Sequence, residues 1–367
     1  MLRVVAGLGG ALLIVLNLAE FFVTFLLPRR VKRDVRLARG LYILALRPWR
    51  ALAGRLSPRG ADTLLGIFGP LGLIFTLTVW TLGLMLGFAL LQYAAGSHVL
   101  AHGHAGFWDD LYFSAGAFLS DTTAVSPQTA GAKVLMLTEA AAGFGVLFIV
   151  IGYLPALYEA FSRREVVVSQ LDPRAGSPPS AGSLLMRSAE RGGWDEIADY
   201  LSEWDDWAAE LMETHLAYPI LAWYRSQHVN QNWLAAMTTV LDTSAFTMAA
   251  EPGRAGHAAE LTFAISRHAL ADLAFTFGAE PELPPADRLP PAQLAQLHAQ
   301  LSDRDLPLPD LDVLSERLDE LRGTYERYAY PLSGRLVLAL PSWMPSDDSQ
   351  ENWRAALWQS REVRSLP

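Results

Sequence analysis

The sequence predicts an all-α membrane protein. It is expected to have three transmembrane helices, a re-entrant pore helix and loop between the second and third, and a mainly helical cytoplasmic domain. Three apolar runs are long enough to cross a bilayer, which requires about 20 helical residues. A shorter helical stretch lies between the second and third runs. The first half of the chain is basic and the second half is acidic.

The composition supports a membrane part followed by a solvated part. Of the 367 residues, 51% are hydrophobic and 18% are charged, which is a low charge content for a wholly soluble protein. Residues 1–162 hold 12 basic and 8 acidic residues, and residues 163–367 hold the other 17 and 30. An acidic second half argues against a nucleic-acid partner. The chain has no cysteine, which excludes disulfides, thiolate catalysis and cysteine metal sites.

The three apolar runs span residues 4–27, 64–95 and 134–161. The first is interrupted only by Glu20, and the second has no charge at all. A cleaved signal peptide is the alternative for the first run. Its length, the lack of a clear A-x-A site and the Pro28-Arg29-Arg30 ending favour a retained helix.

The loop charges predict the orientation in the cell inner membrane. Ten basic residues separate the first two runs: Arg29, Arg30, Lys32, Arg33, Arg36, Arg39, Arg47, Arg50, Arg55 and Arg59. Such a loop is expected in the cytoplasm, which places the N-terminus outside and the C-terminal domain in the cytoplasm. Within this loop, residues 35–56 have an amphipathic helical pattern. That pattern favours a basic membrane anchor, with a lipid-sensing or gating arm as the alternative.

Residues 108–119 are too short to span a bilayer, and a re-entrant helix fits this length. Asp109 and Asp110 lie at its start, where negative charge favours the helix dipole. An irregular return at membrane depth is tolerated where protein or water covers it. A short helix followed by a return loop, between two spanning helices, therefore predicts a pore.

This order of elements resembles the ion-channel module of the potassium-channel superfamily. It is most similar to bacterial chains with one pore loop that are often labelled two-pore-domain-type potassium channels. Tyr112-Phe113-Ser114 resembles the start of their pore helix, and Ser126-Pro127 the polar–proline pair after their filter. Residues 151–180 resemble their third-helix exit, and residues 215–245 their cytoplasmic domain. The resemblance implies a homotetramer that conducts monovalent cations, potassium above all, with no cofactor and no catalytic residue.

The filter departs from the family pattern T-x-G-Y-G-D. The residues at these positions are Ser120, Asp121, Thr122, Thr123, Ala124 and Val125. Both glycines are missing, although a filter lined by backbone carbonyls needs residues that tolerate positive φ. A ring of four Asp121 carboxylates would instead favour cations with low selectivity. A collapsed loop in a non-conducting sensor or scaffold is the alternative, and Asp121 alone fits a turn-capping role equally well.

Two further groups are candidates for a role in the pore. Gly143 and Gly145 in the third run permit close helix packing and are also possible gating hinges. His98, His102 and His104 lie in the expected external loop, where they could bind a metal or respond to pH. Their two-residue spacing, without a carboxylate motif, is a weak metal signal and favours a solvated loop.

The expected domain order has six parts. They are a first transmembrane helix (1–28), a basic amphipathic segment (29–63), a pore module (64–162), a linker (163–182), a helical cytoplasmic domain (183–280) and an acidic helical C-terminal region (281–367). A strand-like run covers residues 166–171. After the linker, periodicity predicts helices over 183–211, 219–227, 232–250, 255–277, 292–302 and 310–330.

No catalytic motif is present, and we expect no enzyme activity. The chain has no nucleotide-binding loop, no G-x-S-x-G and no H-E-x-x-H. The scattered polar residues His215, His228, Asp242, His257, Glu260 and His268 have no metal-ligand spacing. We expect structural roles for them. A metal or ligand site between helices of the bundle is the alternative.

Overall fold

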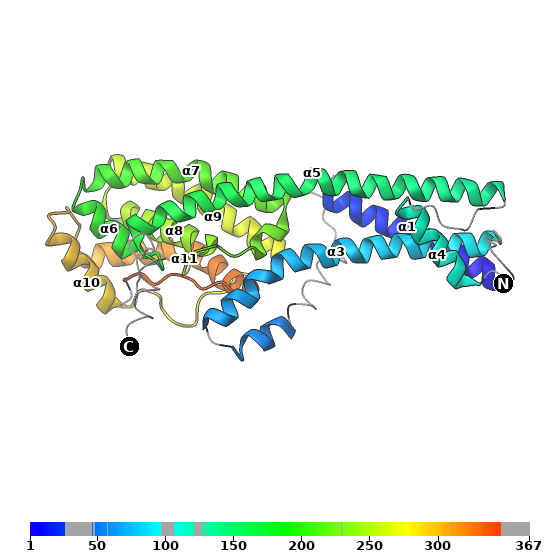
Figure 1. Cartoon of the computed structure of the whole chain (residues 1–367). Helices are drawn as coiled ribbons and strands as arrows, with labels where there is room; N and C mark the ends of the chain where they lie inside the picture. Colours follow the sequence, from blue (N-terminus) through cyan, green and yellow to red (C-terminus); the bar gives the residue numbers. More distant parts are fainter. Residues whose placement is uncertain are drawn as a thin grey trace, which may run out of the picture. The chain divides into compact units, whose positions relative to one another are not determined.

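The computed structural model describes residues 1–25, 46, 48–56, 58–96, 106–120, 127, 129–228 and 230–345 (Figure 1). Within these ranges the chain is helical and contains no strand. It divides into two compact units, Met1–Tyr158 and Glu159–Pro367. Among the described residues, three helices are long and apolar enough to cross a membrane, as the sequence predicts.

The first unit contains α1 (Leu2–Phe25), α3 (Pro58–Ala95), α4 (Phe107–Phe118) and the first part of α5 (Ala130–Ala175). These bounds agree with the three apolar runs and with the predicted short helix. Of the basic segment, residues 48–53 are described as helical. The indole N–H of Trp49 donates to the carbonyl of Leu64 at 2.7 Å, which ties this turn to α3.

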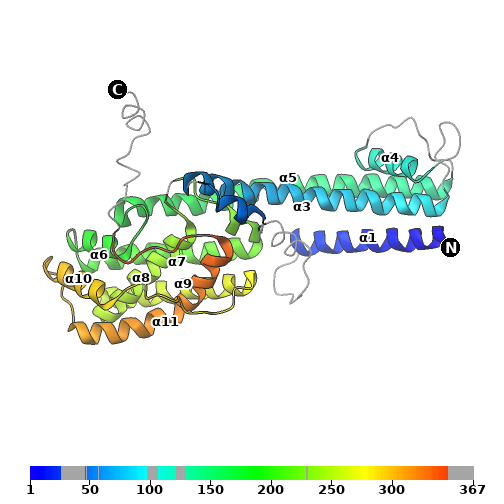
Figure 2. The same ribbon diagram turned by 90° about the horizontal axis from the view of Figure 1, so that it is seen from below.

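Helices α1 and α3 run antiparallel and side by side (Figure 2). Gly10 packs directly on Gly87, where an added Cβ would lie 2.6 Å from the Gly87 carbonyl oxygen. Further along, the rings of Phe21 and Trp80 meet edge to face at 5.6 Å. Small residues allow two helix backbones to approach closely. Inside a membrane, where no hydrophobic effect drives helices together, such close packing stabilises their association.

The second unit is a helical bundle. Its helices are the end of α5, α6 (Ala181–Ala189), α7 (Trp194–Ala217), the 3-10 helix η1 (Pro219–Trp223), α8 (Trp233–Ala250), α9 (Arg254–Phe277), α10 (Pro291–Ser302) and α11 (Leu311–Leu336). The central helix is α8, which packs against α6, α9 and α11. Sixteen of its eighteen residues are buried.

Three buried threonines of α8 are satisfied by the helix itself. Thr238, Thr243 and Thr247 each donate a hydroxyl hydrogen to the carbonyl four residues earlier, at 2.7 to 2.9 Å. Such bonds let threonine sit in a buried helix without an unpaired hydroxyl. At the start of the helix, the Asn232 side chain accepts from the backbone N–H of Ala235 at 2.7 Å and so caps it.

The prediction of a strand-like run at residues 166–171 is wrong. The helix α5 continues through this run to Ala175, so the first part of the expected linker is also helical. Along α5, Leu157, Arg164, Val168 and Leu171 are all buried, at the spacing of a single helix face. Packing of that face outweighs the strand preference of the valines.

Three other predicted helices differ from the structure. The predicted helix 183–211 is two helices, α6 and α7, which are separated by residues 190–193. The segment 219–227 contains only the five-residue 3-10 helix η1. In contrast, α11 extends to Leu336, past the predicted end at 330, and includes Pro331. Proline normally interrupts a helix. Here Leu332 and Leu336 are buried on the far side of it, which favours continuation of the helix.

Candidate functional site

The candidate pore helix α4 has a capped start and a sharply turned end. The backbone N–H of Gly106 donates to the carboxylate of Asp109 at 2.8 Å. Asp109 and Asp110 also place negative charge in the first turn, where the helix dipole is positive. After Phe118, Ser120 adopts a left-handed conformation with φ of 58°. Glycine is the residue that favours this position after a helix, so a serine there is locally strained.

Helix α4 packs on the end of α3 and runs in the opposite direction to it. The rings of Phe107 and Tyr93 contact at 6.2 Å, and seven residues later Ser114 reaches the carbonyl oxygen of Met85 at 2.8 Å. Met85 lies ten residues before the end of α3 at Ala95. At the rise of an α-helix, these ten residues correspond to about 15 Å along the α3 axis.

The same short helix also packs on α5. A Cβ on Gly143 would lie 2.1 Å from the carbonyl oxygen of Phe118, so only glycine fits where α4 ends. Phe118 further contacts Leu84 and Met85 of α3, with Val146 of α5 at the edge of the cluster. The end of α4 is therefore packed between α3 and α5. We call this contact of Phe118 with Leu84, Met85 and Gly143 the seat of α4.

A buried polar chain crosses this seat. The hydroxyl of Ser114 lies within hydrogen-bond distance of both the Met85 carbonyl and the Glu139 carboxyl group of α5. Ser114 and Glu139 are both 0% exposed. Sequence reasoning missed this pair. A signal was present, because an acidic residue inside an apolar membrane run is a functional candidate by itself.

Of the predicted filter residues, the structure describes only Ser120. Asp121, Thr122, Thr123, Ala124 and Val125 lie outside the described residues, and so do His98, His102 and His104. The acidic ring and the histidine hypotheses therefore stay predictions.

The two candidate hinge glycines differ in their surroundings. Both lie within the uninterrupted helix α5. Gly143 is held tightly against the end of α4, whereas Gly145 has no neighbouring heavy atom within 4 Å of an added Cβ. Close packing thus accounts for Gly143, and hinge motion at either glycine stays a prediction.

In the second unit, Arg164 anchors the end of α5. Its guanidinium donates to the carbonyl oxygens of Leu221 and Tyr224, both at 2.9 Å, and to the Glu165 carboxylate at 2.9 Å. A fourth contact joins Nη1 to Nε2 of His215 at 3.2 Å. Arg164 is 3% exposed, so its charge is buried. Its hydrogen bonds hold the end of α5 against η1 and α7.

The contacts of His215 define its protonation. Nδ1 lies 2.8 Å from the carbonyl oxygen of Leu211, which can only accept a hydrogen bond. Nε2 faces Arg164, which can only donate. The imidazole is therefore neutral, with its hydrogen on Nδ1. Burial, and then the charge of Arg164, lower the pKa of His215 well below its ordinary value.

The other polar residues that the sequence singled out do not assemble a metal site. No group of three or more potential metal ligands occurs among the described residues. Asp242 is buried on α8, where Arg288 pairs with both of its oxygens at 3.1 and 2.7 Å and the Tyr325 hydroxyl donates to it. Arg288 also pairs with Glu326 at 2.9 Å. This network connects the loop before α10 to α8 and α11, which is a structural role.

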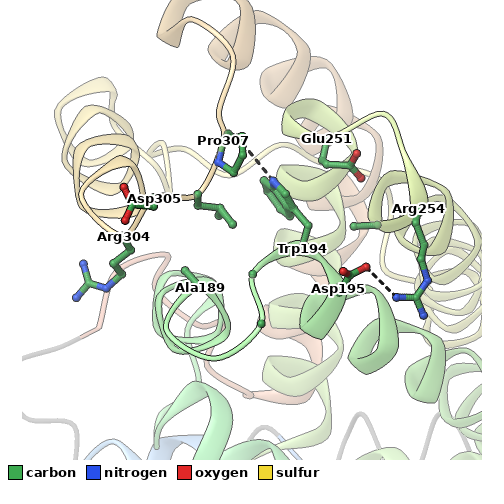
Figure 3. A pocket seen from close by; sticks show the side chains of 12 residues that line it. Ala189, Trp194, Asp195, Glu251, Arg254, Arg304, Asp305 and Pro307 are labelled. Carbon is green, nitrogen blue, oxygen red and sulfur yellow. Dashed lines mark hydrogen bonds and ion pairs between the residues drawn. The ribbon is translucent and has the colours of Figure 1, made fainter.

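One hollow of about 340 Å³ lies where the α6–α7, α8–α9 and α10–α11 turns meet (Figure 3). Trp194 crosses it, and its indole N–H donates to the Pro307 carbonyl at 3.2 Å. Arg254 pairs with Asp195 at 3.1 Å, and Arg304 pairs with Glu190 at 3.0 Å. Because these charged side chains already have protein partners, the hollow does not indicate a class of ligand.

In comparisons with known proteins, the chain matches no protein-family model, no curated protein and no solved structure.

Proposed function

We propose that this chain is the subunit of a homotetrameric, potassium-channel-like pore that conducts monovalent cations passively across the inner membrane. Its filter is atypical and of low selectivity, and the second unit regulates conduction from the cytoplasm. The observation that carries this proposal is the seat of α4 between α3 and α5.

The depth of α4 supports a re-entrant role. If Ala95 marks the outer end of the α3 span, α4 ends beside Met85, about 15 Å deeper at helical rise. A bilayer core is about 30 Å thick, so the chain would turn back near its middle. Backbone that leaves a helix at this depth requires cover by protein or water. A wet axis shared by several subunits supplies that cover.

The lipid bilayer is the partner that the first unit requires. In α1 and in α5, only 11% of the 18-residue apolar stretch that could span a membrane is buried within the chain. In α3 the buried share of that stretch is 44%. Large apolar side chains such as Leu8, Leu12, Phe148 and Ile151 are exposed. Lipid or sister subunits would cover them. The basic segment before α3 favours its cytoplasmic placement, and Arg163 and Arg164, directly after the third apolar run, favour that of the second unit.

The regulatory part of the proposal is supported by Arg164. The buried arginine joins the end of α5 to three groups of the bundle, which are the carbonyl oxygens of Leu221 and Tyr224 and the ring of His215. Since α5 begins in the pore module, a ligand or partner that shifts η1 or α7 would act on the helix that seats α4. Such a shift requires a differential affinity for two states.

The second candidate function is a non-conducting membrane sensor or scaffold with channel-like architecture. The absence of both filter glycines favours it, because threonine and alanine resist the positive φ that a carbonyl-lined filter uses.

Planar-bilayer recording of the purified full chain tests conduction. We expect a cation-selective current with weak discrimination between potassium and sodium. The D121N variant removes the proposed carboxylate ring and should lower the cation-to-anion permeability ratio several-fold, most strongly at low salt. D109N, which neutralises a carboxylate at the other end of α4, is the matched control and should change this ratio much less.

A second variant separates the two candidate functions. Replacing residues 120–125 by a T-x-G-Y-G-D sequence restores the glycines that a potassium filter needs. If the wild type is silent and this variant conducts potassium, the surrounding pore is intact and the natural protein is the non-conducting form. If neither protein conducts under any voltage, the channel proposal fails.

A further inference from the structure

We propose that Glu139 is a neutral carboxylic acid and that its proton ties the pore helix α4 to both flanking helices. The tie would make conduction depend on pH, and this consequence rests on the proposed function. The protonation itself does not, because it is measured without ion flow.

Counting hydrogens leads to this assignment. Three oxygens lie in a row: the Glu139 carboxyl, the Ser114 hydroxyl and the Met85 carbonyl. A backbone carbonyl and an ionised carboxylate are both acceptors only, and a serine hydroxyl supplies one hydrogen. Two hydrogen bonds need two hydrogens. The second must come from Glu139, so Glu139 donates to Ser114 and Ser114 donates to Met85.

The burial of Glu139 supports the same assignment. The residue is 0% exposed, and its second carboxyl oxygen has no hydrogen-bond partner among the described residues. No arginine, lysine or histidine in the described ranges forms an ion pair with it. A buried carboxylate without a cation is so costly that the group takes up a proton instead.

The titratable neighbours give no reason for a charged Glu139. On α4, Asp110 is 4% exposed and lies one turn before Ser114, so any charge on it would repel a carboxylate at 139. On α3, the nearest titratable group is Tyr93, whose ring contacts Phe107. On α5 itself, Lys133 is exposed. None of these groups offers a compensating positive charge at the seat.

Loss of the proton would release α4. An ionised Glu139 and the Met85 carbonyl would compete for the single hydrogen of Ser114. One of the two hydrogen bonds of Ser114 would break, and a buried charge would remain on Glu139. Because Ser114 lies only six residues before Ser120, where the candidate filter begins, we expect conduction to fall as the pH is raised.

Infrared spectroscopy of the full chain tests the proton directly. In the wild type, we expect the C=O stretching band of a protonated carboxylic acid at neutral pH. The E139Q variant should lose that band, and D110N serves as the control for the other buried carboxyl group. If E139Q loses a carboxylate band and no carboxylic acid band, the proposal is overturned.

Variants of Glu139 and Ser114 test the role of this hydrogen-bonded pair. Glutamine keeps an N–H donor toward Ser114, so E139Q should keep the wild-type thermal midpoint and conduct without pH dependence. E139A and S114A each remove a tie and should lower the thermal midpoint. An E139Q channel with the wild-type pH profile would contradict the regulatory role. If the wild type conducts nothing at any pH, the proposed function fails, while the infrared result still decides the state of Glu139.

Discussion

Two glycines two residues apart have opposite roles in the structure. Gly143 meets the last carbonyl of α4, and Gly145 faces open space. A backbone carbonyl cannot rotate out of the way as a long side chain can. The position of α4 therefore depends on the missing side chain at residue 143, whereas residue 145 has space for a larger group among the described residues of the chain.

This difference predicts the effects of G143A and G145A. In G143A, the new methyl group would lie 2.1 Å from the Phe118 oxygen, so α4 must move. Overpacking of this kind costs about 1–3 kcal/mol. We expect a lower thermal midpoint of the solubilised full chain and a reduced current.

G145A is the matched control for that variant. Alanine is a better helix former than glycine by up to about 1 kcal/mol, so its stability should be unchanged or higher. A stable G145A protein with altered gating would instead support the hinge prediction at this residue. Equal stability of G143A and the wild type would contradict the packing role of Gly143.

At the scale of single residues, the sequence predicts the position of α4 better than it predicts the residues that α4 contacts. The length and flanks of α4 follow from its apolar pattern and its two aspartates. The Ser114–Glu139 pair does not, because the two residues are 25 positions apart and only the packing of α4 on α5 brings them together. Whether Gly143 or Gly145 touches α4 likewise depends on helix rotation, which one sequence does not define.

Among the elements, α5 shows how packing extends a helix beyond its sequence signal. Its apolar run ends near 161, and the three valines that follow favour a strand. The buried guanidinium of Arg164 and the buried side chains of Val168 and Leu171 keep the helix intact to Ala175. The contacts that decide this come from η1 and α7, more than 50 residues later.

Arg164 and Arg163 form a natural pair of variants. R164A removes the donor to Leu221, Tyr224 and His215, and the loss of one partner from a buried charged site costs about 3–5 kcal/mol. R163A should cost no more than about 1 kcal/mol, because Arg163 is half exposed in its pairs with Glu159 and Glu210. Chemical denaturation of both variants measures the difference. Equal losses of unfolding free energy in the two variants would contradict the anchoring role of Arg164.

The stability of the second unit should depend on pH through His215. Its pKa is lowered in the folded protein by burial and by Arg164, so the unfolded chain binds the proton more readily. The stabilising effect is complete above the ordinary histidine pKa of about 6.5 and declines as the pH falls below it. The loss has a maximum slope of about 1.4 kcal/mol per pH unit.

Substitution of His215 identifies its share of that slope. H215Q should flatten the decline in the unfolding free energy between neutral and mildly acidic pH. H268Q is the control, because the His268 side chain is 61% exposed, and it should keep the wild-type slope. Identical slopes for H215Q and the wild type would contradict the neutral, buried state of His215.

For the whole molecule, the composition changes from apolar and basic to acidic near residue 162, and the structure divides into two compact units after Tyr158. Helix order in the second unit also follows from periodicity, apart from the short η1, the longer α11 and the predicted helix 183–211, which is two helices, α6 and α7. The polar residues of α8 make its central position hard to predict, because Thr238, Asp242 and Thr243 are of types that usually lie at the surface. Their hydrogen bonds make burial acceptable, and only tertiary structure reveals them.

The topology of the whole chain can be tested without removing native thiols, because it has no cysteine. In intact cells, a membrane-impermeant maleimide should label K133C, which would lie outside near the start of α5. It should label V313C, exposed on α11, only after the cells are opened. Labelling of V313C in intact cells would reverse the proposed orientation.

The contact of Gly10 with Gly87 has a practical consequence for measuring motion. Because two backbones meet there, α1 and α3 should move as one body. Leu8 and Leu12 of α1 are 70% and 60% exposed. A spectroscopic probe at either leucine would report displacements of α3 without any substitution in α3, α4 or α5.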